Sequence, residues 1–249
     1  PAERSPNGKP LLVVGNEILS GRTRDANVQY LGAALGELGI RLVEVRVVED
    51  DVAAIVEALD QLRERHAYVF TTGGIGPTHD DVTAAAVARA FGRGLGRHPE
   101  AVRRLERFYG AEINAARLKM AEIPDGAELI DNPISAAPGF RLGNVHVFAG
   151  VPRIMQAMFE GIRHSLKGGP RMLSETVTIS IPEGRLAAGL AEAQTRNPRV
   201  EIGSYPFSHG ERKGVRVVVR GHGAGDVAAA VADVKIVAAD LGGRVEEEG

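Results

Sequence analysis

The sequence predicts an α/β fold with mostly parallel strands, followed by a small ferredoxin-like α+β domain. Three observations lead to this prediction. As far as Leu166, strand-like and helix-like segments alternate with short connections, which is typical of parallel strands joined by right-handed crossovers. The stretch KGGP, Lys167–Pro170, has the composition of a linker, and the order of elements changes after it. A length of 249 residues suits a large domain plus a small one.

The first elements can be justified in chain order. Pro10–Gly15, PLLVVG, is a continuous apolar run, as expected for a strand buried on both faces. Asp25–Gly39 has apolar residues at helical spacing, with Asp25 as the expected N-cap and Gly39 as the stop. Ile40–Val48 alternates and is rich in β-branched residues, which predicts a strand. The same patterns predict a helix over Val52–Arg65, a strand over Ala67–Thr72, a helix over Val82–Phe91, a helical region in two pieces over Pro99–Met120, strands over Glu128–Asp131 and Asn144–Ala149, and a helix over Pro152–Leu166.

A different order follows the linker. The predicted elements there are a strand over Ser174–Ile181, a helix over Glu183–Arg196, strands over Val200–Pro206 and Gly214–Arg220, a helix over Val227–Leu241, and a short final strand. The order βαββα with a last β is that of a ferredoxin-like domain. We therefore expect one domain over residues 10–167 and a second over residues 171–249.

Composition narrows the classes of partner. The net charge is −2 with both signs interspersed, and aromatic residues make up only 4% of the chain, so nucleic acid and anionic membranes are not expected partners. There is no cysteine, which excludes disulfides, thiolate zinc sites and cysteine nucleophiles and fits a reducing compartment. No apolar run suits a signal peptide or a membrane span. We expect a cytoplasmic protein whose ligand is a small molecule.

Two loops carry most of the polar chemistry, Gly15–Asn27 and Thr71–Thr83. If the strand order begins 2-1-3, both loops open into the crevice where doubly wound sheets bind ligands. The backbone of Gly73–Gly76 is expected to hold phosphate, with no room for a methyl group at Gly74. The adjacent Asp80 and Asp81 would repel that phosphate unless a divalent cation lay between them. The loops therefore predict a phosphate ester together with Mg²⁺.

Each charged candidate also has a simpler interpretation. One of Asp80, Asp81 and Thr83 is expected to cap the helix that starts here, which leaves one aspartate for another task. Asp50, after the second strand, is either a third carboxylate near the crevice or the N-cap of the next helix. Glu17 is either a metal ligand or a solvated loop charge.

Four motifs in order resemble one known family. They are VVGNEILSGRTRDAN, TTGGIGPTHDDVT, NPISAAPGF and AGVPRIMQAMF, and together they extend from about Leu11 to Leu166. They look like the molybdopterin-binding domain family, and within it most like the branch of competence-damage-inducible protein A and the related domain of eukaryotic FAD synthases. IGSYPF, Ile202–Phe207, resembles the small domain that follows in stand-alone members.

This resemblance implies a three-layer α/β domain with its ligand in the crevice described above, and a homo-oligomer. Molybdopterin adenylyltransferases of the wider family use an acidic pair that matches Asp50 and Asp81 by motif position. The competence-damage branch is associated instead with metal-dependent hydrolysis of ADP-ribose and related dinucleotide pyrophosphates. Asn16 stands where many cofactor-synthesis relatives have an acidic residue, which disfavours the molybdopterin interpretation. We expect neither the amidohydrolase domain of the full-length competence-damage proteins nor the catalytic domain of FAD synthases in this chain.

The leading hypothesis is a metal-dependent pyrophosphatase acting on ADP-ribose, FAD or similar dinucleotides. Asp50 and Asp81 are its predicted catalytic residues, and Asp80, Asp81 and Glu17 its predicted ligands for a divalent metal, Mg²⁺. The alternatives are binding or adenylylation of molybdopterin, and a non-catalytic module that binds a nucleotide or pterin. The predicted ligand-binding residues come from the motifs and from one lysine before the third motif: Gly15, Asn16, Glu17, Thr72, Gly73, Gly74, Gly76, Pro77, Thr78, Thr83, Lys119, Ser135, Pro138 and Gly139.

Overall fold

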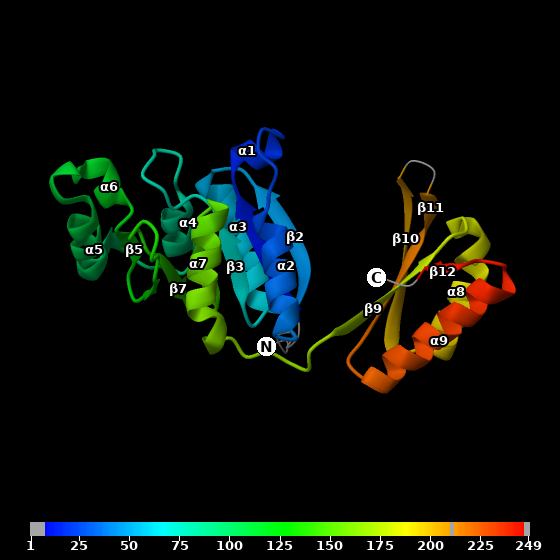
Figure 1. Cartoon of the computed structure of the whole chain (residues 1–249). Helices are drawn as coiled ribbons and strands as arrows, with labels where there is room; N and C mark the ends of the chain where they lie inside the picture. The colour runs from blue at the N-terminus through cyan, green and yellow to red at the C-terminus, as the bar shows by residue number, and fades with distance from the viewer. Residues whose placement is uncertain (1–7, 210–211, 247–249) are drawn as a thin grey trace. The chain divides into compact units, whose positions relative to one another are not determined.

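The structure is a computed structural model that describes residues 8–209 and 212–246. The chain divides into two compact units, Pro1–Gly169 and Pro170–Gly249 (Figure 1). The change of pattern at the glycine-rich linker therefore coincides with a division of the folded chain.

A six-stranded sheet forms the centre of the first unit, in the order β2-β1-β3-β8-β7-β6. Its strands are β1 (Gly8–Val14), β2 (Arg41–Val48), β3 (Val69–Thr72), β6 (Glu128–Ile130), β7 (Gly139–Leu142) and β8 (Val145–Phe148). β2, β1, β3 and β8 are parallel, and β7 and β6 are antiparallel to their neighbours. The sheet is thus mostly parallel as predicted, and its order begins 2-1-3.

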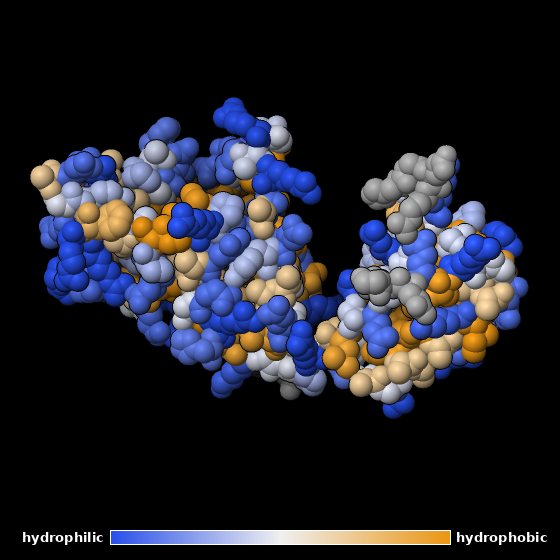
Figure 2. Space-filling model, in the orientation of Figure 1, coloured by the Kyte–Doolittle hydropathy of each residue, from blue (hydrophilic) through white to orange (hydrophobic). Residues whose placement is uncertain are grey.

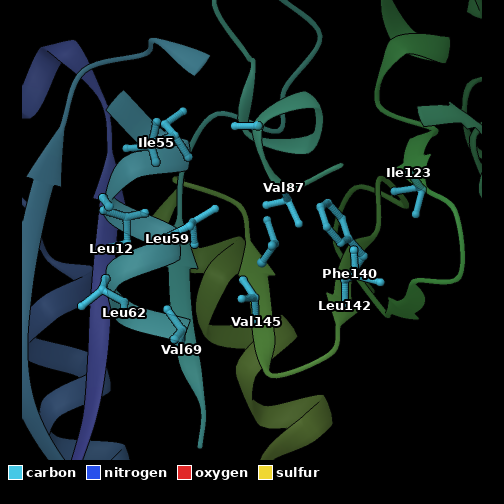
Figure 3. Packing of buried hydrophobic residues seen from close by; sticks show 14 residues of the cluster. Leu12, Ile55, Leu59, Leu62, Val69, Val87, Ile123, Phe140, Leu142 and Val145 are labelled. Carbon is cyan, nitrogen blue, oxygen red and sulfur yellow. The ribbon is translucent and has the colours of Figure 1, made fainter. Parts of the chain in front are cut away.

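Helices cover both faces of this sheet, so the three-layer prediction is confirmed. The covering helices are α2 (Asn27–Glu37) and α7 (Pro152–Ile162) on one face, and α3 (Val52–Arg65) and α4 (Thr83–Ala90) on the other. β1 alternates between the two layers: Leu11 and Val13 join the cluster of α2 and α7, while Leu12 and Val14 join that of α3 and α4. Figure 3 shows the second cluster, in which Leu12 packs with Ile55 and Leu59 of α3.

Several boundaries differ from the sequence prediction. The sequence prediction includes neither β7 nor the two-stranded sheet of β4 (Leu95–Arg97) and β5 (Glu122–Pro124). Each of these strands is defined by pairing with its partner rather than by a pattern of its own. The region over Pro99–Met120 forms two helices as predicted, α5 (Pro99–Tyr109) and α6 (Ala115–Lys119), separated by the 3₁₀ turn Gly110–Glu112. α1 (Asn16–Leu19) is a single helical turn inside the predicted first loop.

The second unit is a separate four-stranded antiparallel sheet with two helices. The elements are β9 (Leu173–Ile179), α8 (Glu183–Arg196), β10 (Val200–His209), β11 (Arg212–Gly221), α9 (Ala224–Asp240) and β12 (Val245–Glu246). The strand order is β10-β11-β9-β12. This is the βαββαβ order and topology of a ferredoxin-like domain, with the final strand present. An apolar cluster holds it together, and Ile179, Leu186 and Val217 are among its fully buried members.

The described part of the chain contains no helix of sufficient length and hydropathy to cross a membrane. Figure 2 shows hydrophilic and hydrophobic residues mixed over most of the visible surface, with hydrophobic residues gathered along the lower rim of the second unit.

Candidate functional site

The carboxyl ends of the parallel strands are tied together by backbone hydrogen bonds. The Gly15 N–H, after β1, donates to the carbonyl of Val48 at the end of β2, with an N···O distance of 3.1 Å. The Gly73 N–H, after β3, donates to the carbonyl of Phe148 at the end of β8, also at 3.1 Å. The two predicted loops therefore start side by side at one edge of the sheet, where this class of fold binds ligands.

Asp50 faces the first loop. Its Oδ2 accepts a hydrogen bond from the Asn16 N–H at 2.8 Å, at the start of α1. The N-cap of α3 is the next residue, Asp51, whose Oδ1 accepts from the N–H groups of Ala53 and Ala54, both at 2.9 Å. Of the two interpretations of Asp50, the structure excludes the helix cap and places this carboxylate at the sheet edge, where it holds the first loop.

The glycines of the second loop make room for Thr83. Gly73 and Gly74 have φ values of +99° and +67°, a region that favours glycine. Thr83 folds back onto them: its Oγ1 donates to the Gly73 carbonyl and its N–H to the Gly74 carbonyl, each at 2.9 Å. A Cβ on Gly74 would overlap Thr83 Oγ1. The space at Gly74 thus accommodates Thr83, and an alanine methyl would meet this side chain before any phosphate.

Asp81 organises the rest of this loop. Its Oδ2 accepts from the N–H and the hydroxyl of Thr78, at 2.8 and 2.5 Å. A Cβ on Gly76 would lie 2.6 Å from the same oxygen, so glycine is needed there for the carboxylate to approach the backbone.

The expected helix cap is not found. α4 begins after Val82 without a side-chain cap, so neither aspartate nor Thr83 caps it, because Asp81 and Thr83 both bond back into the loop. Asp80 is fully exposed, and the nearby Thr78 hydroxyl and its own backbone N–H lower the pKa of its carboxyl group.

A cleft of about 110 Å³ lies beside this loop. Its walls come from the loop, α4, α6, the two-stranded sheet of β4 and β5, and the start of β7. The lining residues are Gly74, Ile75, Gly76, Asp81, Val82, Ala84, Ala85, Leu95, Lys119, Met120, Glu122, Ile123, Pro138 and Phe140. Lys119 also donates a hydrogen bond from Nζ to the Thr78 carbonyl, which holds its ammonium group at the loop. The cleft is smaller than the roughly 300–1,000 Å³ of pockets that enclose a drug-sized ligand, so it would enclose only part of a dinucleotide.

Five of the predicted residues therefore line one cleft: Gly74, Gly76, Asp81, Lys119 and Pro138. The others do not. In the first loop, the carboxylate of Glu17 lies over Gly15, where a Cβ would be 2.7 Å from Glu17 Oε2. Thr72 is buried, and its Oγ1 has no hydrogen-bond partner. Gly139 packs its backbone against the Val147 carbonyl, which a Cβ at this position would overlap, so its role is close packing within the sheet.

The predicted metal ligands do not form a cluster. Within residues 8–209 and 212–246, no three histidine or acidic side chains come together in a way that could hold a metal ion. Glu17, Asp80 and Asp81 are therefore not a preformed set. A cation here would need ligand oxygens in addition to protein carboxylate.

Sequence reasoning missed two asparagines that position the loops. Asn132 is buried; its Nδ2 donates to Ser135 Oγ at 2.6 Å and to the Ala137 carbonyl at 2.8 Å, and its Oδ1 accepts from the N–H groups of Ile134 and Ser135. It thereby shapes the turn that leads to Pro138 on the cleft. The Asn-Pro pair was the available signal, since it favours a turn.

Asn27 is the second. Its Nδ2 donates to the Gly150 carbonyl at 2.8 Å. Gly150 in turn lies against Gly73: a Cβ at position 150 would be only 3.2 Å from the Gly73 Cα. Asn27 thus connects the start of α2 to the loop after β8. No pattern in the sequence distinguishes this asparagine from an ordinary helix-start residue.

Comparisons with known proteins agree with this architecture. Residues 11–167 match the family described as "Probable molybdopterin binding domain", and residues 171–239 match "FAD synthase, middle domain". A protein of Aeropyrum pernix is 39% identical over 259 residues, covering 96% of both chains. A "CinA-like protein" of Syntrophus aciditrophicus is 38% identical over 79% of this chain, which spans about half (50%) of that relative's length. The crystal structure of the protein CinA from Thermoplasma acidophilum superimposes with a TM-score of 0.61 and 34% identity, over 64% of this chain and 97% of that one.

Proposed function

Since this chain belongs to the molybdopterin-binding domain family, we propose that it is a metal-dependent pyrophosphatase acting on dinucleotides such as ADP-ribose or FAD. One observation carries the proposal. A carboxylate, Asp81, and an ammonium group, Lys119, share the wall of a small cleft at the ligand-binding edge of the sheet. That combination suits a phosphate ester accompanied by a cation.

The cleft residues fit a hard cation. The lining residues include carboxylates and no histidine or thiolate. Both hydrogen bonds from Thr78 end on Asp81 Oδ2, so Oδ1 would be the oxygen that takes a cation. Magnesium typically takes one or two carboxylates and completes its shell with phosphate oxygens and water, so the absence of a three-ligand cluster in the described residues is compatible with it. When bound, Mg²⁺ would screen the phosphate charge from Asp81 and draw electrons from the pyrophosphate oxygens.

The chain's own groups would bind and orient the pyrophosphate. Lys119 attracts phosphate oxygens, and its tie to the Thr78 carbonyl keeps it at the cleft. Apolar side chains such as Val82, Ile123 and Phe140 form much of the remaining wall, so this charge is screened less than it would be in bulk water. Asp50 accepts a hydrogen bond from the Asn16 N–H and so holds the first loop, which would form the neighbouring wall of the crevice, in position. The nucleoside parts of a dinucleotide would extend from the cleft over these loops.

A second candidate rests on the family match over residues 11–167. In that case the same cleft would take the phosphate of molybdopterin, and the chain would bind or adenylylate it without hydrolysing dinucleotides.

Hydrolysis assays on the full chain separate these candidates. We would measure product release from ADP-ribose, FAD and other dinucleotides with Mg²⁺, with Mn²⁺ and with EDTA, together with binding of molybdopterin by calorimetry. Metal-dependent turnover that falls in Asp81→Asn but not in Asp240→Asn, a control at the end of α9, supports the pyrophosphatase. Binding of molybdopterin without turnover of any dinucleotide would refute it in favour of the second candidate. Neither turnover nor binding would refute both.

A further inference from the structure

The lobe between α4 and β5 has the opposite charge to the chain as a whole. Residues 91–119 include β4, α5, a 3₁₀ turn and α6, and they contain seven arginine and lysine residues and three glutamates. These residues therefore carry a net charge of +4, whereas the whole chain carries −2. Figure 1 shows α5 and α6 at one end of the first unit, next to β5. A positive lobe beside the candidate site would raise the local concentration of an anionic ligand.

Four of the seven cations in this lobe already have partners: Arg103, Arg104, Arg117 and Lys119. Within residues 8–209 and 212–246, the guanidinium groups of Arg93, Arg97 and Arg107 have neither a hydrogen bond nor an ion pair. A phosphate group that binds one of these three arginines therefore displaces no protein partner.

Arg97 lies at the edge of the cleft. β4 pairs antiparallel with β5, and Arg97 is directly opposite Glu122. Leu95, two residues before Arg97 on β4, and Glu122 both line the cleft. Residues two apart on one strand, and residues opposite each other across a strand pair, have their side chains on the same face of the sheet. The exposed Arg97 side chain is therefore on the cleft face of this sheet, beside two of the lining residues.

Arg93 and Arg107 are placed differently. Arg93 precedes β4 and has no residue opposite it on β5. Arg107 lies on α5, which contributes no residue to the cleft wall. Of these three arginines, Arg97 is the one that is a cross-strand neighbour of a cleft residue.

We propose that Arg97 binds the second phosphoryl group of a diphosphate whose first phosphoryl group lies in the cleft beside Lys119. The cleft, at about 110 Å³, encloses only part of the ligand, and the second phosphoryl group, joined through a single bridging oxygen, would lie at its rim. A guanidinium group suits that position because it donates two parallel hydrogen bonds to phosphate oxygens. This role of Arg97 rests on the proposed function and adds the feature that the site selects, which is two linked phosphoryl groups rather than one.

Glu122 makes binding at Arg97 dependent on the cation. Its carboxylate lies opposite Arg97 on the cleft wall and would repel a phosphoryl group at the rim. The same divalent cation that separates the phosphate from Asp81 would screen this repulsion. A diphosphate accompanied by Mg²⁺ therefore fits this wall better than the free anion does.

Calorimetry of the full chain with Mg²⁺ tests the proposal, with inorganic pyrophosphate and inorganic phosphate as probes. The wild-type chain should bind pyrophosphate more tightly than phosphate. Arg97→Ala should weaken pyrophosphate binding by about tenfold or more, the usual effect of losing a charged hydrogen bond, and phosphate binding by about twofold or less. Arg97→Lys keeps the charge but not the paired geometry, so it should give an intermediate loss. Melting curves should be nearly unchanged, because Arg97 is exposed and has no partner within the described residues.

Arg107→Ala is the matched control, because it removes one positive charge from the same lobe at another exposed arginine. It should lower the affinity for either probe by about twofold or less, through the screened field of the lobe alone. The proposal is overturned if the wild-type chain does not bind pyrophosphate more tightly than phosphate, or if a folded Arg97→Ala chain keeps the wild-type ratio of the two affinities. It is also overturned if Arg93→Ala or Arg107→Ala changes this ratio as much as Arg97→Ala does.

Hydrolysis assays separate the role of Arg97 from the proposed function. A ratio of affinities that depends on Arg97, in a chain that hydrolyses no dinucleotide, would refute the pyrophosphatase and support the diphosphate site. Turnover of a dinucleotide, with a ratio that is indifferent to Arg97, would support the pyrophosphatase and refute the role of Arg97.

Discussion

Asp80 and Asp81 are adjacent carboxylates in very different environments, and replacing each by asparagine tests the site directly. Asp81 lines the cleft and accepts two hydrogen bonds from Thr78. Asp80 is fully exposed and does not line the cleft. Asparagine keeps the size of the side chain and an oxygen that accepts hydrogen bonds, while it removes the negative charge. The Asp81→Asn variant therefore loses the group that would face a cation, and Asp80→Asn serves as its matched control.

The expected magnitudes follow from these contacts. In Asp81→Asn the bonds from Thr78 change from charge-assisted to neutral at a partly exposed position, so the free energy of unfolding should fall by only about 1 kcal/mol. If Asp81 holds the metal, turnover should fall by about a hundredfold or more, the usual consequence of losing a preorganised electrostatic group. Asp80→Asn should change turnover by no more than a few-fold, because an exposed carboxylate outside the cleft interacts weakly with the ligand.

The assay pairs melting curves with metal-dependent hydrolysis of the best dinucleotide substrate, and with calorimetric binding in Mg²⁺ and in EDTA. Near-normal turnover in a folded Asp81→Asn chain would refute the assignment of this site. So would nucleotide affinity that is unchanged by EDTA, because Asp81 would then face phosphate without any cation. A larger loss in Asp80→Asn than in Asp81→Asn would show that the cleft has been assigned to the wrong aspartate.

Three further predictions concern stability. Gly74→Ala forces φ = +67° on alanine and pushes a methyl group into Thr83, so chemical denaturation should show a loss of about 2–3 kcal/mol, whether or not ligand is present. Asn132→Ala removes the hydrogen-bond partners of Ser135 in the buried turn, so the free energy of unfolding, measured by denaturation, should fall by about 2 kcal/mol. Ligand affinity, measured by calorimetry, should also fall. An unchanged affinity would show that this turn does not position the cleft. Burial lowers the pKa of His146 from 6.5 to about 4. The unfolded chain therefore takes up a proton on this residue before the folded chain does, so about 3 kcal/mol of stability, present above pH 6.5, is lost as the pH falls towards 4. His146→Gln should flatten this part of the profile of unfolding free energy against pH, and an unchanged slope would contradict the assignment.

The framework of the first unit is predictable because its elements are long and repetitive. The pattern predicts α3 over its observed bounds, and β2 within one residue, since alternation and helical spacing are local properties of the chain. The observed strand order begins 2-1-3, which is the condition under which the two polar loops open into one crevice. The βαββαβ order of the second unit is also legible, because each element carries its own pattern.

Elements that depend on distant partners are not predictable in this way. β4 and β5 pair across an intervening pair of helices, and neither segment has a pattern of its own. The sequence predicts Asp25 as the cap of α2, but the N-cap is Ala26, and Asp25 instead accepts from the Val28 N–H at 2.7 Å. Such one-residue differences are common, because several N–H groups at a helix start compete for one acceptor.

The sequence by itself determined which loops carry the candidate ligand-binding residues. The conformational freedom of glycine, the restricted φ of proline and the charge of aspartate are properties of the residues themselves and do not depend on the tertiary fold. Only the tertiary structure decided what each residue does there. Asp50 and Asp51 are neighbours with similar local preferences, yet one holds the first loop and the other caps α3, since only the packing of α1 brings Asn16 next to Asp50. Gly74 makes room for the Thr83 side chain, and Lys119 lies 41 residues along the chain from Thr78, whose carbonyl it contacts. These roles depend on contacts between segments distant in the chain, and a local pattern carries no information about such contacts.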